Sequence, residues 1–168
     1  MRTWLGDGTG IEIRPIRPID KDVIARGWSL VSRETQQRRF LAAKPRLTPA
    51  DLRYLTEVDG HDHVALIAVL ADRPTHVLGV GRFVRLVDDP EAAEFAIVVG
   101  DAFHGQGLGG HLADLLAARA AEVGVKRFTG TVLTENTAAQ RLIARISNHL
   151  TYDHQGGGLL EVVADLAA

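Results

Sequence analysis

The sequence predicts a single α/β domain spanning residues 1–168, in which strands alternate with helices. Short apolar or alternating runs typical of strands are separated by segments with apolar residues at helical spacing. A glycine-rich turn, FHGQGLGGHL at residues 103–112, joins one apolar run to a helical pattern. The length of 168 residues suits one domain.

In the N-terminal half we predict one strand, three helices and three further strands. The first strand carries Ile11, Ile13 and Ile16, and prolines end it. Asp20, Ser32 and Thr48 belong to the residue types that cap helices, and a helical pattern follows each of them. The three later strands are expected at residues 64–70, 77–87 and 93–99.

In the C-terminal half we predict a helix after the glycine turn that ends near Gly124. A strand is expected at residues 127–133, and Asn136 caps the next helix. A last strand is expected at residues 159–166, after three consecutive glycines. We assign no element to residues 147–155.

Composition excludes several classes of protein. The net charge of −2 gives no bulk attraction to nucleic acid or to an acidic membrane surface. The absence of cysteine excludes disulfides, thiolate catalysis and cysteine-based zinc sites. No stretch resembles a signal peptide or a membrane span, so we expect a cytoplasmic protein without nucleic-acid or membrane partners.

The glycine turn predicts a phosphate site. Its four glycines lie between a strand and a helix: Gly105, Gly107, Gly109 and Gly110. Such a turn exposes backbone N–H groups, and a helix N-terminus adds about half a positive charge. The sequence therefore predicts binding of a phosphate or pyrophosphate group.

Two glycine motifs fit this turn. Gly105-x-Gly107-x-x-Gly110 matches the dinucleotide fingerprint, and Glu135 lies near the distance of a ribose-binding acid. Residues 104–109 nearly match Q/R-x-x-G-x-G/A, the signature of the GNAT acyltransferase superfamily. Position favours the second motif, because residues 100–104 separate the strand from the glycines and little chain remains for further strand–helix units. Nucleotide binding stays as the weaker alternative.

The predicted order of elements resembles the GNAT fold, most closely from Glu94 to Arg145. That resemblance implies one mixed sheet of six to seven strands flanked by about four helices. It also implies a V-shaped gap between two parallel strands that receives coenzyme A. The segments SRET at residues 32–35 and DGHDHVAL at residues 59–66 resemble bacterial protein-lysine acetyltransferases. Those enzymes often carry a regulatory domain, whereas we expect the catalytic domain alone here.

The resemblance implies roles for the residues around the turn. Backbone N–H groups of Gln106, Gly107, Leu108, Gly109 and Gly110 would bind the pyrophosphate of acetyl-CoA. Backbone groups of Ile97 and Val98 would pair with the pantetheine arm and polarise the thioester carbonyl. Asn136 would contact the pantetheine arm in addition to capping its helix.

Glu94 is the candidate general base that accepts a proton from the incoming amine. A carboxylate on an otherwise apolar strand is unexpected unless it is exposed or functional. The alternative interpretation is a solvent-facing glutamate near a strand start, beside Glu91. The resemblance favours the catalytic role, because the lysine acetyltransferases carry their catalytic glutamate at this position.

Two positions depart from the family pattern. His104 replaces the usual Gln or Arg, and it either donates to phosphate when charged or points outward while the helix N-terminus binds. Ile143 stands where many members have a tyrosine that protonates the leaving thiolate. These departures motivate a second hypothesis, a non-catalytic acyl-CoA-binding module.

The leading expectation is an acetyl-CoA-dependent N-acetyltransferase that acts by direct transfer in a ternary complex. A protein lysine is the preferred acceptor over a small amine. We expect no metal, since Asp59, His61, Asp62 and His63 fit a polar loop entering a strand. The basic residues at 26–53 are expected to form a solvated face; contact with an acidic protein partner or with the 3′-phosphate of CoA is the alternative. The apolar final strand would allow a homodimer.

Overall fold

The computed structural model describes residues 1–42 and 44–167. Its sheet has eight strands in the order β1-β2-β3-β4-β5-β6-β8-β7. The strands are β1 (Arg2–Trp4), β2 (Gly10–Pro15), β3 (His63–Leu70), β4 (Val77–Arg85), β5 (Ala92–Val99), β6 (Arg127–Leu133), β7 (Ser147–Gly156) and β8 (Leu159–Leu166). The helices are α1 (Lys21–Leu30), α2 (Arg33–Phe40), α3 (Pro49–Thr56), α4 (Leu108–Glu122) and α5 (Thr137–Arg145).

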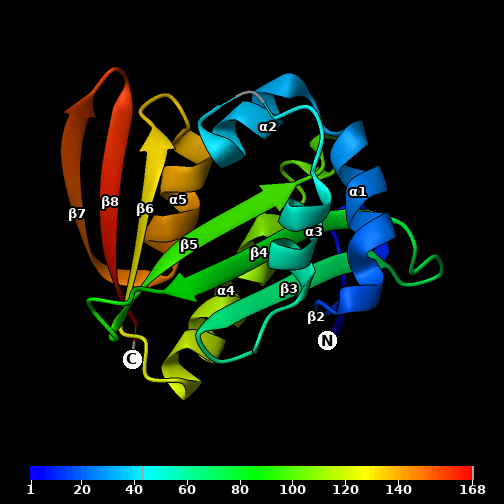
Figure 1. Ribbon diagram of the computed structural model, residues 1–168, viewed down its shortest axis with the longest axis horizontal. Helices are drawn as coiled ribbons and strands as arrows, with labels where there is room; N and C mark the ends of the chain where they lie inside the picture. The colour runs from blue at the N-terminus through cyan, green and yellow to red at the C-terminus, as the bar shows by residue number, and fades with distance from the viewer. Residues whose placement is uncertain (43, 168) are drawn as a thin grey trace.

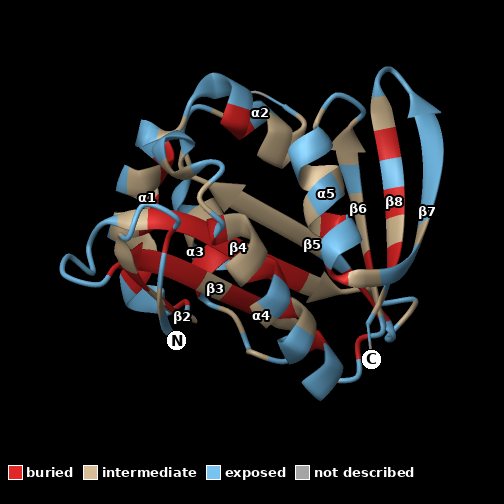
Figure 2. Cartoon of the chain, turned by 180° about the vertical axis from the view of Figure 1, so that it is seen from behind, coloured by how far each residue is buried: buried red, intermediate tan, exposed pale blue. Residues whose placement is uncertain are grey.

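Helices cover both faces of one half of the sheet. α1, α2 and α3 lie over one face of β2–β5, and α4 lies on the opposite face (Figure 1). α5 packs against the strands at the other end, where Ile143 contacts the cluster of Leu160, Val162 and Ala164. β7 is the edge strand and is exposed along most of its length (Figure 2).

The sheet splits between β5 and β6. These two strands are parallel, and they pair only at the start, from Ala92–Arg127 to Glu94–Thr129. Beyond Glu94, β5 stays paired with β4 as far as Val99, while β6 stays paired with β8. Figure 1 shows the two arrows diverging from their common start.

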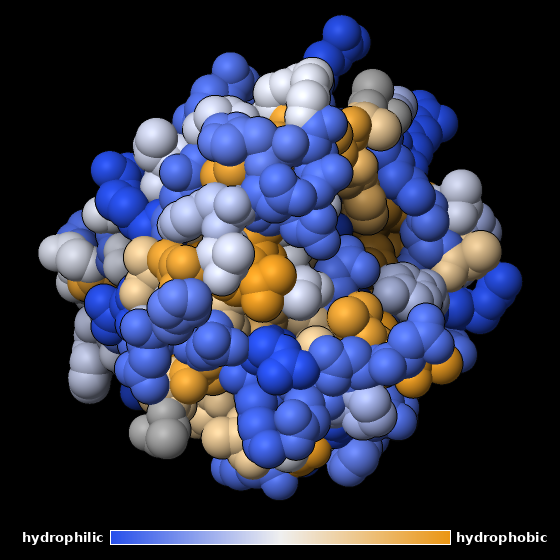
Figure 3. Space-filling model, turned by 90° about the vertical axis from the view of Figure 1, so that its left-hand side faces the viewer, coloured by the Kyte–Doolittle hydropathy of each residue, from blue (hydrophilic) through white to orange (hydrophobic). Residues whose placement is uncertain are grey.

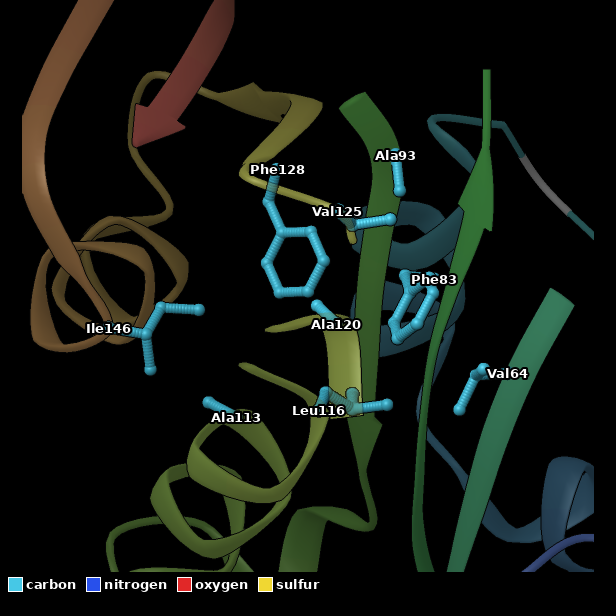
Figure 4. Packing of buried hydrophobic residues seen from close by; sticks show 9 residues of the cluster. All are labelled: Val64, Phe83, Ala93, Ala113, Leu116, Ala120, Val125, Phe128 and Ile146. Atoms are coloured by element: carbon cyan, nitrogen blue, oxygen red, sulfur yellow. The ribbon is translucent and has the colours of Figure 1, made fainter. Parts of the chain in front are cut away.

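Aromatic packing holds the joined end of the split. Phe128 of β6 is buried and stacks on Phe95 of β5, with ring centroids 4.7 Å apart. Its ring also lies 5.5 Å from that of Phe83 on β4. Leu116 and Ala120 of α4 pack in the same cluster (Figure 4). Burial of large apolar side chains is the main stabilising contribution here.

The GNAT-like fold class predicted from the sequence is confirmed, with differences in its elements. The sheet has eight strands: the six that were predicted and two that were not, β1 and β7. The described residues form five α-helices. Ser32 and Thr48 accept the expected capping bonds, from the N–H groups of Thr35 and Asp51. Asp20 lies at the expected N-cap position of α1 but makes no side-chain capping bond: its buried carboxylate instead accepts bonds from Arg14 and from the backbone N–H of Arg17.

Candidate active site

The split between β5 and β6 holds a cleft of about 620 Å³. Its walls come from β5, β6, the glycine turn, and the facing parts of α2 and α5. Seen from the β7 side, the surface is mostly hydrophilic, and hydrophobic residues gather in hollows between the polar ones (Figure 3). The cleft places polar backbone and charged side chains beside apolar walls, as ligand sites do.

The backbone of β5 faces the cleft at alternate residues. In an antiparallel ladder, every second residue bonds to the partner strand, and the residues between point their backbone groups the other way. Gly100 N–H donates to Leu78 and Leu86 N–H donates to the carbonyl of Ala92, which fixes the phase of the β4–β5 ladder. Backbone groups of Phe95, Ile97 and Val99 therefore point into the split.

The two predicted pantetheine contacts differ in this respect. Ile97 and Val98 both line the cleft. The register pairs the backbone of Val98 with Val80 on β4, whereas the N–H and C=O of Ile97 are directed toward the cleft. The backbone edge available to a ligand is thus centred on Ile97.

The glycines of the turn serve different physical purposes. Gly105 and Gly107 have φ of 73° and 91°, a region that L side chains rarely adopt, and the space beside them is open. Gly109 allows α4 to approach α5, because a Cβ there would lie 2.9 Å from Leu142 Cδ1. Gly107 is the N-cap of α4, so the first N–H groups of that helix face the end of the cleft.

The other predicted residues of the turn are placed unevenly. Leu108 and His104 line the cleft along with Gly105, Gly107 and Gly109, whereas Gln106 and Gly110 are not among its lining residues. The Gln106 side chain donates to the carbonyl of Ala102. His104 is exposed, and its Nε2 donates to the carbonyl of Val99 at 2.9 Å, so that nitrogen carries the proton.

Glu94 lies at the point where the strands part. It is the last β5 residue paired with β6, and its side chain lies on the sheet face that α1–α3 cover. Its carboxylate is exposed and lines the cleft. Arg39 of α2 lines the same cleft and feels the charge of Glu94. A general base needs this access to an incoming amine.

Two arginines near Glu94 were not predicted as site residues. Arg39 lies among the basic residues expected to form a solvated face, yet burial lowers its pKa, and Glu94 and Tyr54 oppose that shift. Arg82 of β4 is 5% exposed; burial and then the charge of Arg39 lower its pKa to about 9. An arginine in the apolar run VGRFV was the sequence signal that could have identified it.

Asp101 connects α2 to the turn after β5. Its carboxylate accepts bonds from the backbone N–H and hydroxyl of Ser32 and from the hydroxyl of Thr35, at 2.7–2.8 Å. Burial raises the pKa of Asp101, but these hydrogen bonds together lower it by more than burial raises it, so the net shift is downward. The residue positions the wall of the cleft that carries Arg39.

The α5 wall of the cleft has an apolar residue at the position where the resemblance places a tyrosine. Asn136 lines the cleft and accepts the N–H of Ala139, which confirms its capping role. Ile143 also lines the cleft and is 7% exposed. No tyrosine is among the cleft-lining residues within 1–42 and 44–167.

The Asp59–His63 segment is a turn that enters β3. The Asp59 carboxylate accepts the N–H groups of His61, Asp62 and His63. Burial, then the charge of Arg82, lowers the pKa of His63 to about 4, and its Nε2 accepts a bond from Arg82. In the described part of the chain, no group of three or more His, Asp or Glu is placed to hold a metal, and no helix is long and apolar enough to cross a membrane.

Comparisons with known proteins agree with this architecture. Acetyltransferase Pat of Mycolicibacterium smegmatis is 37% identical over 146 residues, which cover 83% of this chain and 41% of Pat. The crystal structure of the GNAT domain of S. lividans PAT matches with a TM-score of 0.87 and 28% identity, over 99% of this chain and 96% of that domain. A cAMP-binding acyltransferase from Mycobacterium smegmatis matches with a TM-score of 0.69 and 28% identity, over 100% of this chain and 47% of its own.

The chain thus spans about two fifths of the length of the curated relative that it matches at 37% identity. The model of the acetyltransferase (GNAT) domain family matches residues 11–147. This match extends from β2 to the start of β7 and includes the split strands and the glycine turn. The chain therefore belongs to the GNAT acetyltransferase domain family.

Proposed function

We propose that this chain is an acetyl-CoA-dependent N-acetyltransferase whose acceptor is a lysine side chain of a protein. The single observation that carries the proposal is the split itself. It combines an unpaired β5 edge, a glycine turn at a helix N-terminus and an exposed carboxylate in one cleft. Similarity to Pat and to the PAT GNAT domain supports the choice of a protein lysine.

Acetyl-CoA fits the cleft in two ways. The N–H groups at the start of α4, with Gly105 and Gly107 leaving open space, suit the pyrophosphate. The backbone of Ile97 suits an added strand formed by the amide groups of pantetheine. We assign the neighbouring backbone groups of Phe95 and Val99 to the same edge, and Asn136 to the opposite wall.

The reaction needs a base and a stabilised oxyanion. Glu94 accepts a proton from the ammonium, directly or through one water, and the amine nitrogen then attacks the thioester carbonyl carbon. A new C–N bond forms, the C–S bond breaks, and coenzyme A leaves as a thiolate that takes a proton from solvent or from the acceptor. A backbone N–H of the β5 edge stabilises the charge that develops on the carbonyl oxygen.

Glu94→Gln tests the proposal. We expect acetylation of a lysine peptide to fall by about 100-fold or more, in line with typical contributions of a general base. The dissociation constant of acetyl-CoA should stay within a factor of about two, because the pyrophosphate and pantetheine contacts are elsewhere. Glu91→Gln is the matched control, since Glu91 is exposed just before the same strand, pairs with Lys126 and is not among the residues that line the cleft.

The second candidate function is a non-catalytic acyl-CoA-binding module. The apolar wall at Ile143, where many family members have a tyrosine, favours it. Unchanged turnover in Glu94→Gln would refute the base assignment. Tight acetyl-CoA binding by the wild-type chain without release of thiol in the presence of amines would favour the module.

A further inference from the structure

Arg39 of α2 and Arg82 of β4 line one small cavity, and the charge of Arg39 acts on Arg82. Arg39 lines the main cleft and also a second, smaller cavity of about 70 Å³ between α1, α2 and β4. Arg82 lines that second cavity from the β4 side. Phe40 and Val98 line both spaces, so the two are neighbours in the fold.

In the described residues, no carboxylate lies at ion-pair distance from either arginine. Arg82 donates to the Leu55 carbonyl and to His63 Nε2. Both partners are uncharged: one is a backbone carbonyl, and the imidazole is neutral because its Nε2 accepts the bond. Arg39 lies over the Phe40 ring, with Cζ 4.7 Å from its centroid, and no ion pair of either arginine is found within residues 1–42 and 44–167. Glu94 is the acid whose charge acts on Arg39.

Such an arrangement is costly without a ligand. Two guanidinium groups that repel one another lose solvation on burial, and no paired carboxylate offsets that loss. A guanidinium binds a carboxylate through two parallel N–H···O bonds, which is the strongest geometry available to it. A carboxylate bound at Arg39 would offset both the burial and the repulsion.

We propose that Arg39, supported by Arg82, binds a carboxylate carried by the acceptor, so that the preferred acceptor is an amine with an acidic group close by. This inference rests on the proposed transferase function. Glu94 would receive the ammonium while Arg39 holds the carboxylate in the same cleft, which fixes the orientation of the amine. The carboxylate is supplied either by an acidic side chain beside a protein lysine or by the carboxyl group of a free amino acid.

Paired acceptors test this proposal. One pair is two lysine peptides that differ only by Glu or Gln beside the lysine, and the other is free lysine and lysinamide. For each acceptor, kcat and KM are measured, and binding to the chain is measured by calorimetry without acetyl-CoA. We expect the acidic member of one pair to show a KM and a dissociation constant about tenfold lower. The pair that shows the difference identifies the source of the carboxylate.

Arg39→Gln should remove this preference, and Arg39→Lys should retain part of it. Arg33→Gln is the matched control, because Arg33 is exposed on α2 and lines neither cavity. Equal KM and binding within both pairs, absence of acceptor binding in both, or a preference that survives in Arg39→Gln would overturn the inference. Turnover without preference would leave the transferase function intact, whereas carboxylate-dependent binding without turnover would contradict the function alone. A weaker affinity of Arg39→Gln for acetyl-CoA would show that Arg39 contacts the donor instead.

Discussion

The two edges of β5 belong to the same residues but differ in how far their backbone groups are paired. Toward β4, the strand is paired from Ala93 to Val99. Toward β6, pairing stops at Glu94, and the remaining backbone groups face the cleft. The unpaired backbone groups of β5 therefore contribute to the site as much as the side chains of that strand do.

Packing explains where the pairing stops. Phe95 contacts the cluster around Phe128 and also the cluster under α5 that contains Ile143, so its ring lies between the diverging strands. Gly109 lets Leu142 of α5 come close to α4, and both residues line the cleft. The joined end is therefore apolar and closely packed, while the open end presents unpaired backbone beside apolar and polar side chains.

The largest expected effect is at the joined end. Phe128→Ala removes the ring that stacks on Phe95, and we expect it to lower the free energy of unfolding by about 3–5 kcal/mol. Urea unfolding followed by circular dichroism measures this change. A loss below about 1 kcal/mol, the size of a tolerated core swap, would mean that the paired backbone alone holds the strands together.

Substitutions in the glycine turn test the open end of the split, where we expect acetyl-CoA to bind. Gly107→Ala forces a side chain into a positive φ, which costs about 1–2 kcal/mol, and should weaken acetyl-CoA binding about tenfold. Gly110→Ala is the control: its Cβ would make an ordinary contact of 3.5 Å with Arg145, and alanine favours the helix. Calorimetric titration separates the two variants. Equal affinities in both would contradict a role for the Gly107 conformation.

The smallest effect concerns the attachment of α2 to the end of β5. Asp101→Asn weakens the bonds to Ser32 and Thr35, and we expect a loss of about 1 kcal/mol at pH 7 because the carboxylate is largely exposed. Since folding lowers the pKa of Asp101 below 3.8, its stabilisation is present above that pH and is lost as the pH falls through the folded-state pKa. Urea midpoints of the two proteins should therefore converge below about pH 4. A constant difference down to pH 3 would contradict this origin.

Sequence patterns located the elements that are periodic or strongly capped. The strand at residues 127–133 and the last strand at 159–166 agree with the structure, and Ser32, Thr48 and Asn136 cap their helices as expected. β7 was missed because residues on an exposed edge strand show little alternation between apolar and polar types. Asp20 lies at the expected N-cap position, but its carboxylate pairs with Arg14, and sequence alone does not separate a capping side chain from a buried ion-pair side chain.

The site was predictable where local geometry decides it and not where strand register does. Glycines 105 and 107 carry their conformational signal in the sequence. Which backbone groups of β5 face the cleft depends on its pairing with β4, so the choice between Ile97 and Val98 needed the register. Arg39 of α2 and Arg82 of β4 line the same small cavity although they are far apart along the chain.

The most direct test of the split as an acyl-CoA site is a thermal-shift titration with acetyl-CoA, coenzyme A and NADH, with thiol release followed in the same samples. A ligand at 100 times its Kd stabilises the folded state by about 2.7 kcal/mol, which raises Tm by a few degrees. We expect a shift with acetyl-CoA and coenzyme A and none with NADH, together with thiol release when a lysine peptide is added. Absence of any shift at millimolar acetyl-CoA, or a shift with NADH that coenzyme A does not compete with, would contradict this expectation.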